Sequence, residues 1–417
     1  MIWLTILQPS FPLSITPAPS KSTCNKIVWF RDHGLRIQDN EALYNAIKAC
    51  QQHTTNVQSS ADDQSSPMII PIYLWNRDPY QDSSGGGIAS ELFIAHTLKF
   101  INEQLDGNLV QGFIDGIDED KFLQGHINSP LQQDSIIMNL NTFVKKRAAI
   151  VVKELLSICE ATSSTDIYYI SSSDTIYEEA LKKLLQEENG ITVHTFHGCS
   201  LLNYSSKEDI PWKEIILEHP FRSPLIPFVD FVLKKLSNTP PSKPIQIQLD
   251  TLLSSLSNIG VINPKVFRNP VDIDCLLQKL GKSYGGTEWG RTILGSFSIN
   301  ESKINQDLDS FLISLGSKEN SEKQTHFTSR ISPYLARGLL SPRQVYHSII
   351  SSGVDKEKDS FVRRICWRDY THAVVSLYPD VLYGVPIRDG YDDGSCDVLD
   401  REKMNLFEMW KKGSTGE

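Results

Sequence analysis

The hydrophobic positions in the first half of the chain form short, unbroken runs that alternate with longer stretches of helical spacing. Residues 26–30 (KIVWF) and 68–75 (MIIPIYLW) are strand-length runs rich in β-branched and aromatic residues, typical of strands buried on both faces of a sheet. The same pattern predicts three more strands, at about 108–114, 166–171 and 191–196. The stretches between them predict helices that begin at Glu41 and cover about 89–105, 143–160 and 175–188. This alternation predicts a doubly wound parallel sheet with helices on both faces.

The pattern weakens in several segments. A Ser- and Gln-rich stretch at 51–66 predicts a surface loop, and residues 115–140 form a long insertion without clear periodicity. Residues 205–270 are rich in Pro and Ser and predict an interdomain connector, after which helical patterns dominate. The predicted organisation is a leader or disordered extension at 1–25, an α/β domain at 26–204, the connector at 205–270 and a helical domain at 271–417.

Composition and charge narrow the classes of function. The chain has 417 residues, long enough for two or three domains, with a formal net charge of −9 and a pI near 5.6. This acidity argues against non-specific nucleic-acid binding, although a local basic cleft is compatible with it. The seven cysteines lie far apart without metal-ligand spacing, so we expect free thiols and no metal site. No apolar stretch reaches the roughly 20 residues of a membrane span, so we expect no membrane partner.

The first segment that carries chemistry is IVWFRDHGLRIQDNEAL at 27–43. Arg31 and Arg36 follow directly on a predicted parallel strand. They therefore place positive charge at the carboxyl edge of the sheet, where α/β folds commonly bind ligands. A plain strand followed by a capped helix explains everything in this segment except the two arginines.

The second segment is THFTSRISPYLARGLLSPRQVYHSII at 325–350. Thr328, Ser329 and Ser332 offer hydroxyl and backbone N–H groups where a helix begins, and Arg330 adds a permanent charge. This set suits an anion such as a diphosphate. The alternative is that the hydroxyl groups only cap a helix.

The third segment is FVRRICWRDYTHAVV at 361–375. On a helix, Phe361, Arg364 and Arg368 fall on one face. The indole of Trp367 can stack on bases, and a guanidinium can bind phosphate. The alternative is a core-facing helix with a surface ion pair.

Together, in this order, the three segments resemble the cryptochrome/DNA photolyase family, over most of residues 26–416. The resemblance implies a Rossmann-like α/β domain followed by an all-α FAD-binding domain, in which TSRISPYLARGLLSPR is similar to the flavin-phosphate segment and the WRD helix to the one that lines the flavin cavity. It implies FAD-binding roles for Thr328, Ser329, Arg330, Ile331, Ser332, Phe361, Arg364 and Arg368, and DNA-binding roles for Arg364, Trp367 and Arg368.

The resemblance also implies what such a chain does. FAD is the expected cofactor, with a second antenna chromophore of folate or deazaflavin type expected in the α/β domain. We favour a cryptochrome-type blue-light photoreceptor acting through signalling proteins, because Arg364 occupies the place where dimer-repair enzymes carry Glu, and Arg accepts no hydrogen bond. The alternative is a deoxyribodipyrimidine photolyase, a carbon–carbon lyase that binds damaged DNA. The expected location is the nucleus or cytoplasm, with a plastid as the option that the leader raises.

Two departures from the family pattern bear on this interpretation. Asp32 and His33 make the gap between WFR and LR one residue longer than the pattern has. The resemblance ends at WKKGSTG, 410–416, where the family pattern continues into further helices. We therefore expect an incomplete, C-terminally truncated FAD domain, and a product without flavin chemistry is the third alternative.

Overall fold

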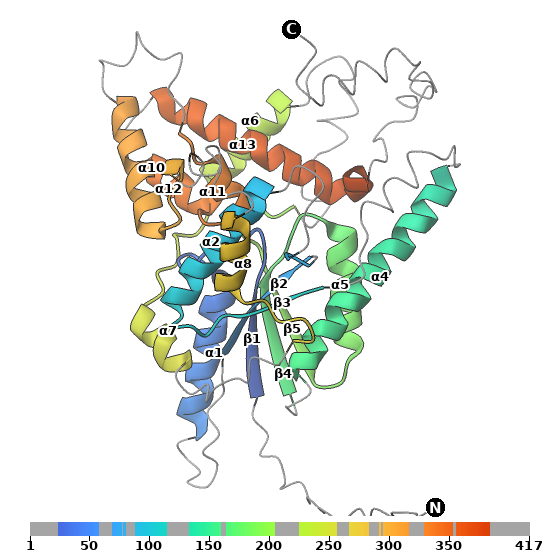
Figure 1. Cartoon of the computed structure of the whole chain (residues 1–417). Coiled ribbons are helices and arrows are strands. Elements are labelled where there is room, and N and C mark those ends of the chain that lie inside the picture. Colours follow the sequence, from blue (N-terminus) through green and yellow to red (C-terminus); the bar gives the residue numbers. More distant parts are fainter. Residues whose placement is uncertain are drawn as a thin grey trace, which may run out of the picture.

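One parallel sheet organises the N-terminal half of the chain. A computed structural model describes residues 24–57, 69–76, 78–80, 88–114, 133–159, 164–204, 225–256, 267–282, 292, 295–316, 329–352 and 356–383. The sheet has five strands in the order β3-β2-β1-β4-β5, all paired in parallel (Figure 1). The strands are β1 (Cys24–Phe30), β2 (Ile69–Trp75), β3 (Val110–Phe113), β4 (Ser164–Ile170) and β5 (Ile191–Phe196). All five predicted strands are confirmed, with small differences at their ends.

Helices cover both faces of the sheet, because successive residues of a strand point to opposite sides. Val28 and Phe30 of β1 join the core on one face, and Ile27 and Trp29 join the core on the other. The first core includes α1 (Glu41–Val57) and α2 (Ile88–Gln104); the second includes α4 (Gln133–Cys159) and α5 (Thr175–Glu187). The predicted doubly wound sheet is confirmed. Its winding changes direction between β1 and β4.

Two predicted loops proved to contain helix. α1 continues to Val57, into the stretch predicted as a loop at 51–66, since neither Gly nor Pro occurs in residues 51–57 to end it. α4 begins at Gln133, within the predicted insertion at 115–140, soon after Pro130 in the sequence. The rest of both segments, 58–66 and 115–132, lies outside the described residues.

Most of the described residues beyond the sheet are helical. Within the predicted connector at 205–270, the structure contains α6 (Leu225–Asn238) and α7 (Leu249–Leu256), whose Phe228 and Leu252 are fully buried. These helices share one continuous core with α1 and α2, so the helical half is built directly onto that face of the sheet. The remaining helices are α8 (Ile273–Leu280), α10 (Glu301–Gly316), α11 (Ser332–Arg337), α12 (Pro342–Ser351), α13 (Lys356–Leu377) and the 3₁₀ helix η6 (Pro379–Tyr383). None of the helices described is long and apolar enough to cross a membrane.

Candidate functional site at the carboxyl edge of the sheet

Helix α13 lies over the loops that follow β4 and β5 (Figure 1). The Asp369 carboxylate accepts hydrogen bonds from the backbone N–H groups of Leu201 (2.7 Å) and Leu202 (3.3 Å) and from the Tyr204 hydroxyl (2.9 Å). Burial raises the pKa of Asp369 to about 7, even though neighbouring Arg368 and these donors favour the charged form. The helix that carries three of the predicted flavin residues, Phe361, Arg364 and Arg368, is thus bonded to the loop that follows β5.

A cavity of about 350 Å³, here called the edge cavity, opens beside α13. Its walls come from the ends of β1, β2 and β4 and from α4, α5, α13 and η6. The edge cavity therefore lies where the winding of the sheet reverses, the position at which open α/β sheets characteristically bind ligands.

Arg31 supplies positive charge to the edge cavity. Its guanidinium carbon lies 4.8 Å from the ring centre of Trp29 and 5.2 Å from that of Tyr169, and Nη1 is 2.6 Å from Oε1 of Glu178. Burial alone would lower the pKa of Arg31, but Glu178 beside it raises the pKa above the ordinary arginine value. The aromatic walls and Glu178 therefore hold this cation in one place. Arg147 of α4 lies over Tyr177 at 5.0 Å and adds a second cation.

Two histidines line the edge cavity: His33, from the loop after β1, and His372 of α13. His33 and His372 meet edge to face, with ring centroids 6.4 Å apart. Nδ1 of His372 lies 2.6 Å from Oγ of Ser173, whereas the buried Nδ1 of His33 has no hydrogen-bond partner among the described residues. Burial lowers the pKa of both imidazoles, that of His372 to about 3. Below the rings, the Tyr73 hydroxyl donates to Oδ1 of Asp32 at 2.6 Å.

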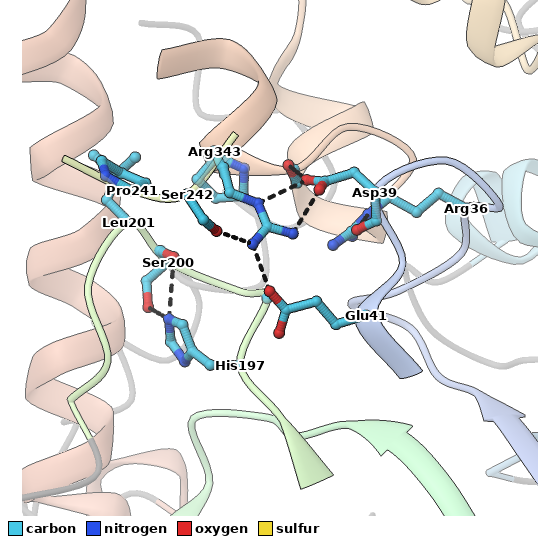
Figure 2. A pocket seen from close by; sticks show the side chains of 12 residues that line it. Arg36, Asp39, Glu41, His197, Ser200, Leu201, Pro241, Ser242 and Arg343 are labelled. Carbon is cyan, nitrogen blue, oxygen red and sulfur yellow. Dashed lines mark hydrogen bonds and ion pairs between the residues drawn. The ribbon is translucent and has the colours of Figure 1, made fainter. Parts of the chain in front are cut away.

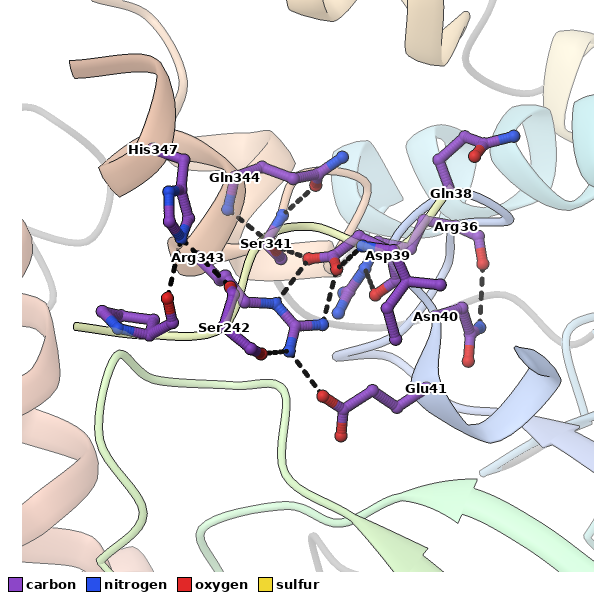
Figure 3. A network of polar contacts seen from close by, with 12 residues as sticks. Arg36, Gln38, Asp39, Asn40, Glu41, Ser242, Ser341, Arg343, Gln344 and His347 are labelled. Carbon is purple, nitrogen blue, oxygen red and sulfur yellow. Dashed lines mark hydrogen bonds and ion pairs between the residues drawn. The ribbon is translucent and has the colours of Figure 1, made fainter. Parts of the chain in front are cut away.

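A second polar cavity, of about 160 Å³ and here called the charged seam, lies between the β1–α1 loop, the loop after β5, residues 241–242 and the start of α12 (Figure 2). Arg343 spans it. The Arg343 guanidinium lies 2.5 Å from Oδ1 of Asp39, 2.5 Å from Oε1 of Glu41 and 2.9 Å from Oγ of Ser242 (Figure 3). Every donor nitrogen of Arg343 is thereby used, including Nε, which is 3.2 Å from Oδ2 of Asp39.

Asp39 is the centre of the charged seam. It is fully buried and adopts a left-handed conformation (φ 54°), which Asp tolerates better than most residues. Its carboxylate also accepts from the Ser341 hydroxyl and from the backbone N–H of Ile245 at 2.8 Å. Ser341 in turn begins α12 with a capping box whose other member is Gln344. The charges of the seam are matched within the protein, which indicates a structural joint and no ligand site.

Comparison with known proteins bears directly on the N-terminal half. The family model of DNA photolyase matches residues 26–112. The deoxyribodipyrimidine photo-lyase of Alkalihalophilus pseudofirmus is 30% identical over 90 residues, 21% of this chain and 18% of that protein. Cryptochrome DASH of Danio rerio is 30% identical over 95 residues, 22% of this chain and 17% of that protein. Residues 26–112 are therefore similar to the cryptochrome/photolyase family.

A structural likeness covers more of the chain than the sequence matches do. A class III photolyase from Agrobacterium tumefaciens matches with a TM-score of 0.56 and 21% identity, covering 95% of this chain and 67% of that one. At 21% identity, this likeness shows that the two chains share a fold, and no more than that. The segments shared with the two curated relatives are less than a fifth of either protein.

The described residues of the predicted flavin-phosphate segment surround the start of α11. Ser329 is partly buried, Arg330 is exposed with a left-handed backbone (φ 53°), Ile331 is buried in the core and Ser332 is the first residue of α11. Thr328 lies outside the described residues. An exposed cation beside a hydroxyl at this point fits a phosphate group.

The predicted residues of α13 take different positions. Phe361 is buried, with its ring centroid 5.0 Å from that of Phe311 on α10. Arg364 is exposed, and Trp367 is 53% exposed. The Arg368 guanidinium donates to the carbonyl oxygens of Cys199 and of Leu335, the latter at 3.1 Å. Arg368 therefore ties α11 and the loop after β5 to α13.

Sequence reasoning missed most of the edge cavity and, apart from Arg36, the charged seam. Of the two arginines predicted at the sheet edge, Arg31 lines the edge cavity, while buried Arg36 donates to backbone oxygens, including that of Gly338 at 2.8 Å. The extra residue in the 31–36 loop was a usable signal, because it brings Asp32 and His33 to the cavity. His372 gave no signal, since its position there depends on how α13 docks.

Proposed function

We propose that this chain is part of an FAD-dependent blue-light protein, and that its function is that of a cryptochrome-type photoreceptor. The observation that carries the choice is Arg364, an exposed guanidinium on α13 at the place where dimer-repair enzymes carry a carboxylate. A guanidinium donates hydrogen bonds and accepts none, so it cannot take over that carboxylate's contact with a damaged base. A photoreceptor would act through protein partners, which have no need of that contact.

The chain's own residues would hold the flavin by its phosphates and by one side of its cavity. Ser329, Arg330 and Ser332 would bind the diphosphate through hydroxyl groups, backbone N–H groups and one permanent charge. Phe361 would form part of the apolar wall of the ring pocket. FAD supplies the light absorption and the one-electron chemistry, while the protein positions it and excludes water.

The edge cavity is the proposed site of the antenna chromophore. A volume of about 350 Å³, aromatic walls and the cations Arg31 and Arg147 suit a planar ring system that carries acid groups. The buried Nδ1 of His33 would find a hydrogen-bond partner on such a ligand. Folate and deazaflavin types both meet this description.

Flavin binding is tested on the purified chain by its absorption spectrum and by titration with FAD. We expect binding that weakens at least about 10-fold in Arg330→Ala, the loss of one charged phosphate contact. Lys99→Ala is the matched control, because Lys99 pairs with Asp274 on α2 and α8, away from this segment. Absence of FAD binding by the unmodified chain would contradict the flavin assignment for these residues.

DNA repair is the second candidate, favoured by one observation. Trp367 is exposed on α13 between arginines, with Arg363 paired to exposed Asp230 at 3.2 Å, and an exposed indole flanked by cations suits base stacking. Repair of a thymine-dimer oligonucleotide under blue light separates the candidates. Repair by the native protein would contradict the photoreceptor; repair gained only by Arg364→Glu would support it.

A further inference from the structure

The two edges of the parallel sheet differ in what lies beside them. At the β3 edge, the chain at 269–271 runs antiparallel to the strand. Phe113 N–H donates to the carbonyl oxygen of Asn269, and Val271 N–H donates to that of Gln111, both at 3.0 Å. At the opposite edge, β5 is the last strand, and none of its six residues is buried, whereas every residue of β2 is buried. Among the described residues, the β3 edge is therefore covered and the β5 edge is open.

The hydrogen-bond pattern shows which backbone groups of β5 face outward. Ser171 N–H donates to the carbonyl oxygen of Phe196 at 2.9 Å, so the backbone groups of Phe196 point toward β4. Because alternate residues of a parallel strand bond to the same neighbour, every second residue from Thr192 to Phe196 bonds to β4. The N–H and C=O groups of Val193 and Thr195 therefore point away from the sheet. No described residue pairs with them.

β5 lacks the features that commonly protect an exposed edge strand. Its sequence, ITVHTF, contains no Asp, Glu, Lys, Arg or Pro, and its pairing with β4 runs in register without a bulge. Most of its residues are β-branched, which favours an extended strand. An open edge of this kind is a template on which another strand can pair.

A row of apolar side chains continues from β5 onto α5. Ile191 and Val193 are half-buried against the core beneath α5, and so are Ala180 and Leu184. On the helix, Ala180 and Leu184 lie on the opposite flank of the buried stripe from Glu178, whose carboxylate reaches inward to the end of β1. The two side chains therefore face the outer side of the domain, next to the open edge of β5.

We propose that β5 pairs antiparallel with β5 of a second copy of this chain and joins the two sheets into one. The two-fold axis passes beside Val193, whose N–H and C=O groups bond to those of the partner's Val193. The same register places Thr195 opposite the partner's Ile191. The interface is then self-complementary, as a two-fold interface has to be.

The features of this edge favour a second copy over another occupant. β5 carries no formal charge at neutral pH, so two copies meet without repulsion, and a charged peptide gains no attraction there. Paired strands lie about 4.8 Å apart and packed helices about 8–10 Å apart, so strand pairing brings α5 beside the partner's α5 and covers the row at Ala180 and Leu184 in both copies. The two helices run antiparallel, which places opposite ends of their dipoles side by side.

Sedimentation velocity of the full chain over a range of concentrations tests the proposal. Thr195→Pro removes an outward N–H group and leaves the groups bonded to β4 in place, since Pro is tolerated on the outer side of an edge strand. The change acts twice in each dimer, so we expect the dissociation constant to rise at least about 10-fold. Thr195→Val is the matched control, because it keeps the N–H group and the β-branched shape, and it should dimerise as the unchanged chain does.

An unchanged chain that stays monomeric at every concentration would overturn the proposal, and so would equal dimerisation of Thr195→Pro and Thr195→Val. Cross-linking decides if Thr195→Pro fails to fold. Residues directly opposite each other in a hydrogen-bonded antiparallel pair have Cα atoms about 5.5 Å apart, within reach of a disulfide. Val193→Cys should form a linked dimer under mild oxidation, and Thr192→Cys, which faces the partner's His194, should not. The unchanged chain with its exposed Cys275 gives the background.

Hydrogen exchange separates a second copy from another segment of the same chain. The amides of Val193 and Thr195 should be protected only at concentrations at which the dimer forms. Protection that persists in the monomer would mean that the chain covers its own β5 edge, and the dimer assignment would then be wrong. None of these outcomes depends on flavin binding, so they stand apart from the proposed function.

Discussion

The edge cavity and the charged seam lie at the same edge of the sheet and are both rich in ionisable groups, yet they use charge in opposite ways. In the charged seam, Arg343 meets Asp39 and Glu41, and each donor has an acceptor. In the edge cavity, burial lowers the pKa of both imidazoles, and Nδ1 of His33 has no partner among the described residues. Ion pairs whose charges are fully matched join two parts of a fold. Polar groups without a partner, beside an open cavity, can instead bind a ligand or a proton.

Removing one charge from the seam should have the largest effect. Asp39→Asn keeps a residue that accepts the left-handed backbone but leaves Arg343 without its main partner. We expect a loss of about 3–5 kcal/mol in the free energy of unfolding, as for other broken buried ion pairs. Urea denaturation measures it. Asp230→Asn breaks the exposed pair with Arg363 and should cost less than about 1 kcal/mol. Similar losses in both variants would contradict the structural role of the seam.

The second-largest loss of stability is expected where Gly338 approaches the backbone of His33. Gly338 has φ +72°, and an added Cβ would lie 2.2 Å from the carbonyl oxygen of His33. Gly338→Ala should therefore destabilise the chain by at least about 2 kcal/mol, because backbone must move on both sides. Gly281→Ala, where an added Cβ meets no atom within 4 Å, should change stability by less than about 1 kcal/mol. Thermal denaturation of both variants at equal concentration compares them, and equal melting temperatures would contradict the close approach.

The third effect, at Asp369, depends on pH. Asp369 has a raised pKa, so its contribution to stability is greatest in acid and is lost as the pH rises through about 7. Asp369→Asn cannot titrate. Between pH 5 and pH 7 the unchanged chain should lose about 2 kcal/mol relative to this variant, at about 1.4 kcal/mol per pH unit. Denaturation at several pH values checks it; a constant difference would show that Asp369 titrates normally.

The smallest effect is expected inside the edge cavity. Tyr73→Phe removes a hydroxyl that donates to Asp32, which keeps Arg337 as a second partner at 3.4 Å. We expect a loss of about 1 kcal/mol by urea denaturation. Tyr44→Phe, at an exposed position on α1, should be neutral. A loss as large as that in Asp39→Asn would show that the cavity wall is as structural as the seam.

The strands were the easiest part of the fold to predict, because a strand such as Ile69–Trp75 is buried along its whole length and reads as an unbroken apolar run. The end of α1 was predicted wrongly, since the two Gln residues at 51 and 52 favour a helix while the two Thr residues at 54 and 55 favour it less. Of the candidate sites, the phosphate segment was visible because Ser329, Arg330 and Ser332 are neighbours in sequence. The charged seam was not visible in the sequence, since Asp39 and Arg343 are 304 positions apart.

The sequence by itself determined the parallel α/β sheet, the helical half and the resemblance to the cryptochrome/photolyase family, since these depend on local periodicity and on contiguous motifs. Tertiary structure alone decided which polar groups meet. It turned Arg36 and Arg368 toward backbone carbonyls, left Arg364 and Trp367 exposed, and brought His33 against His372 of α13. The physical reason is that the charge and pKa of a side chain depend on burial and on neighbours from distant segments. The docking of α11, α12 and α13 onto the sheet supplies those neighbours.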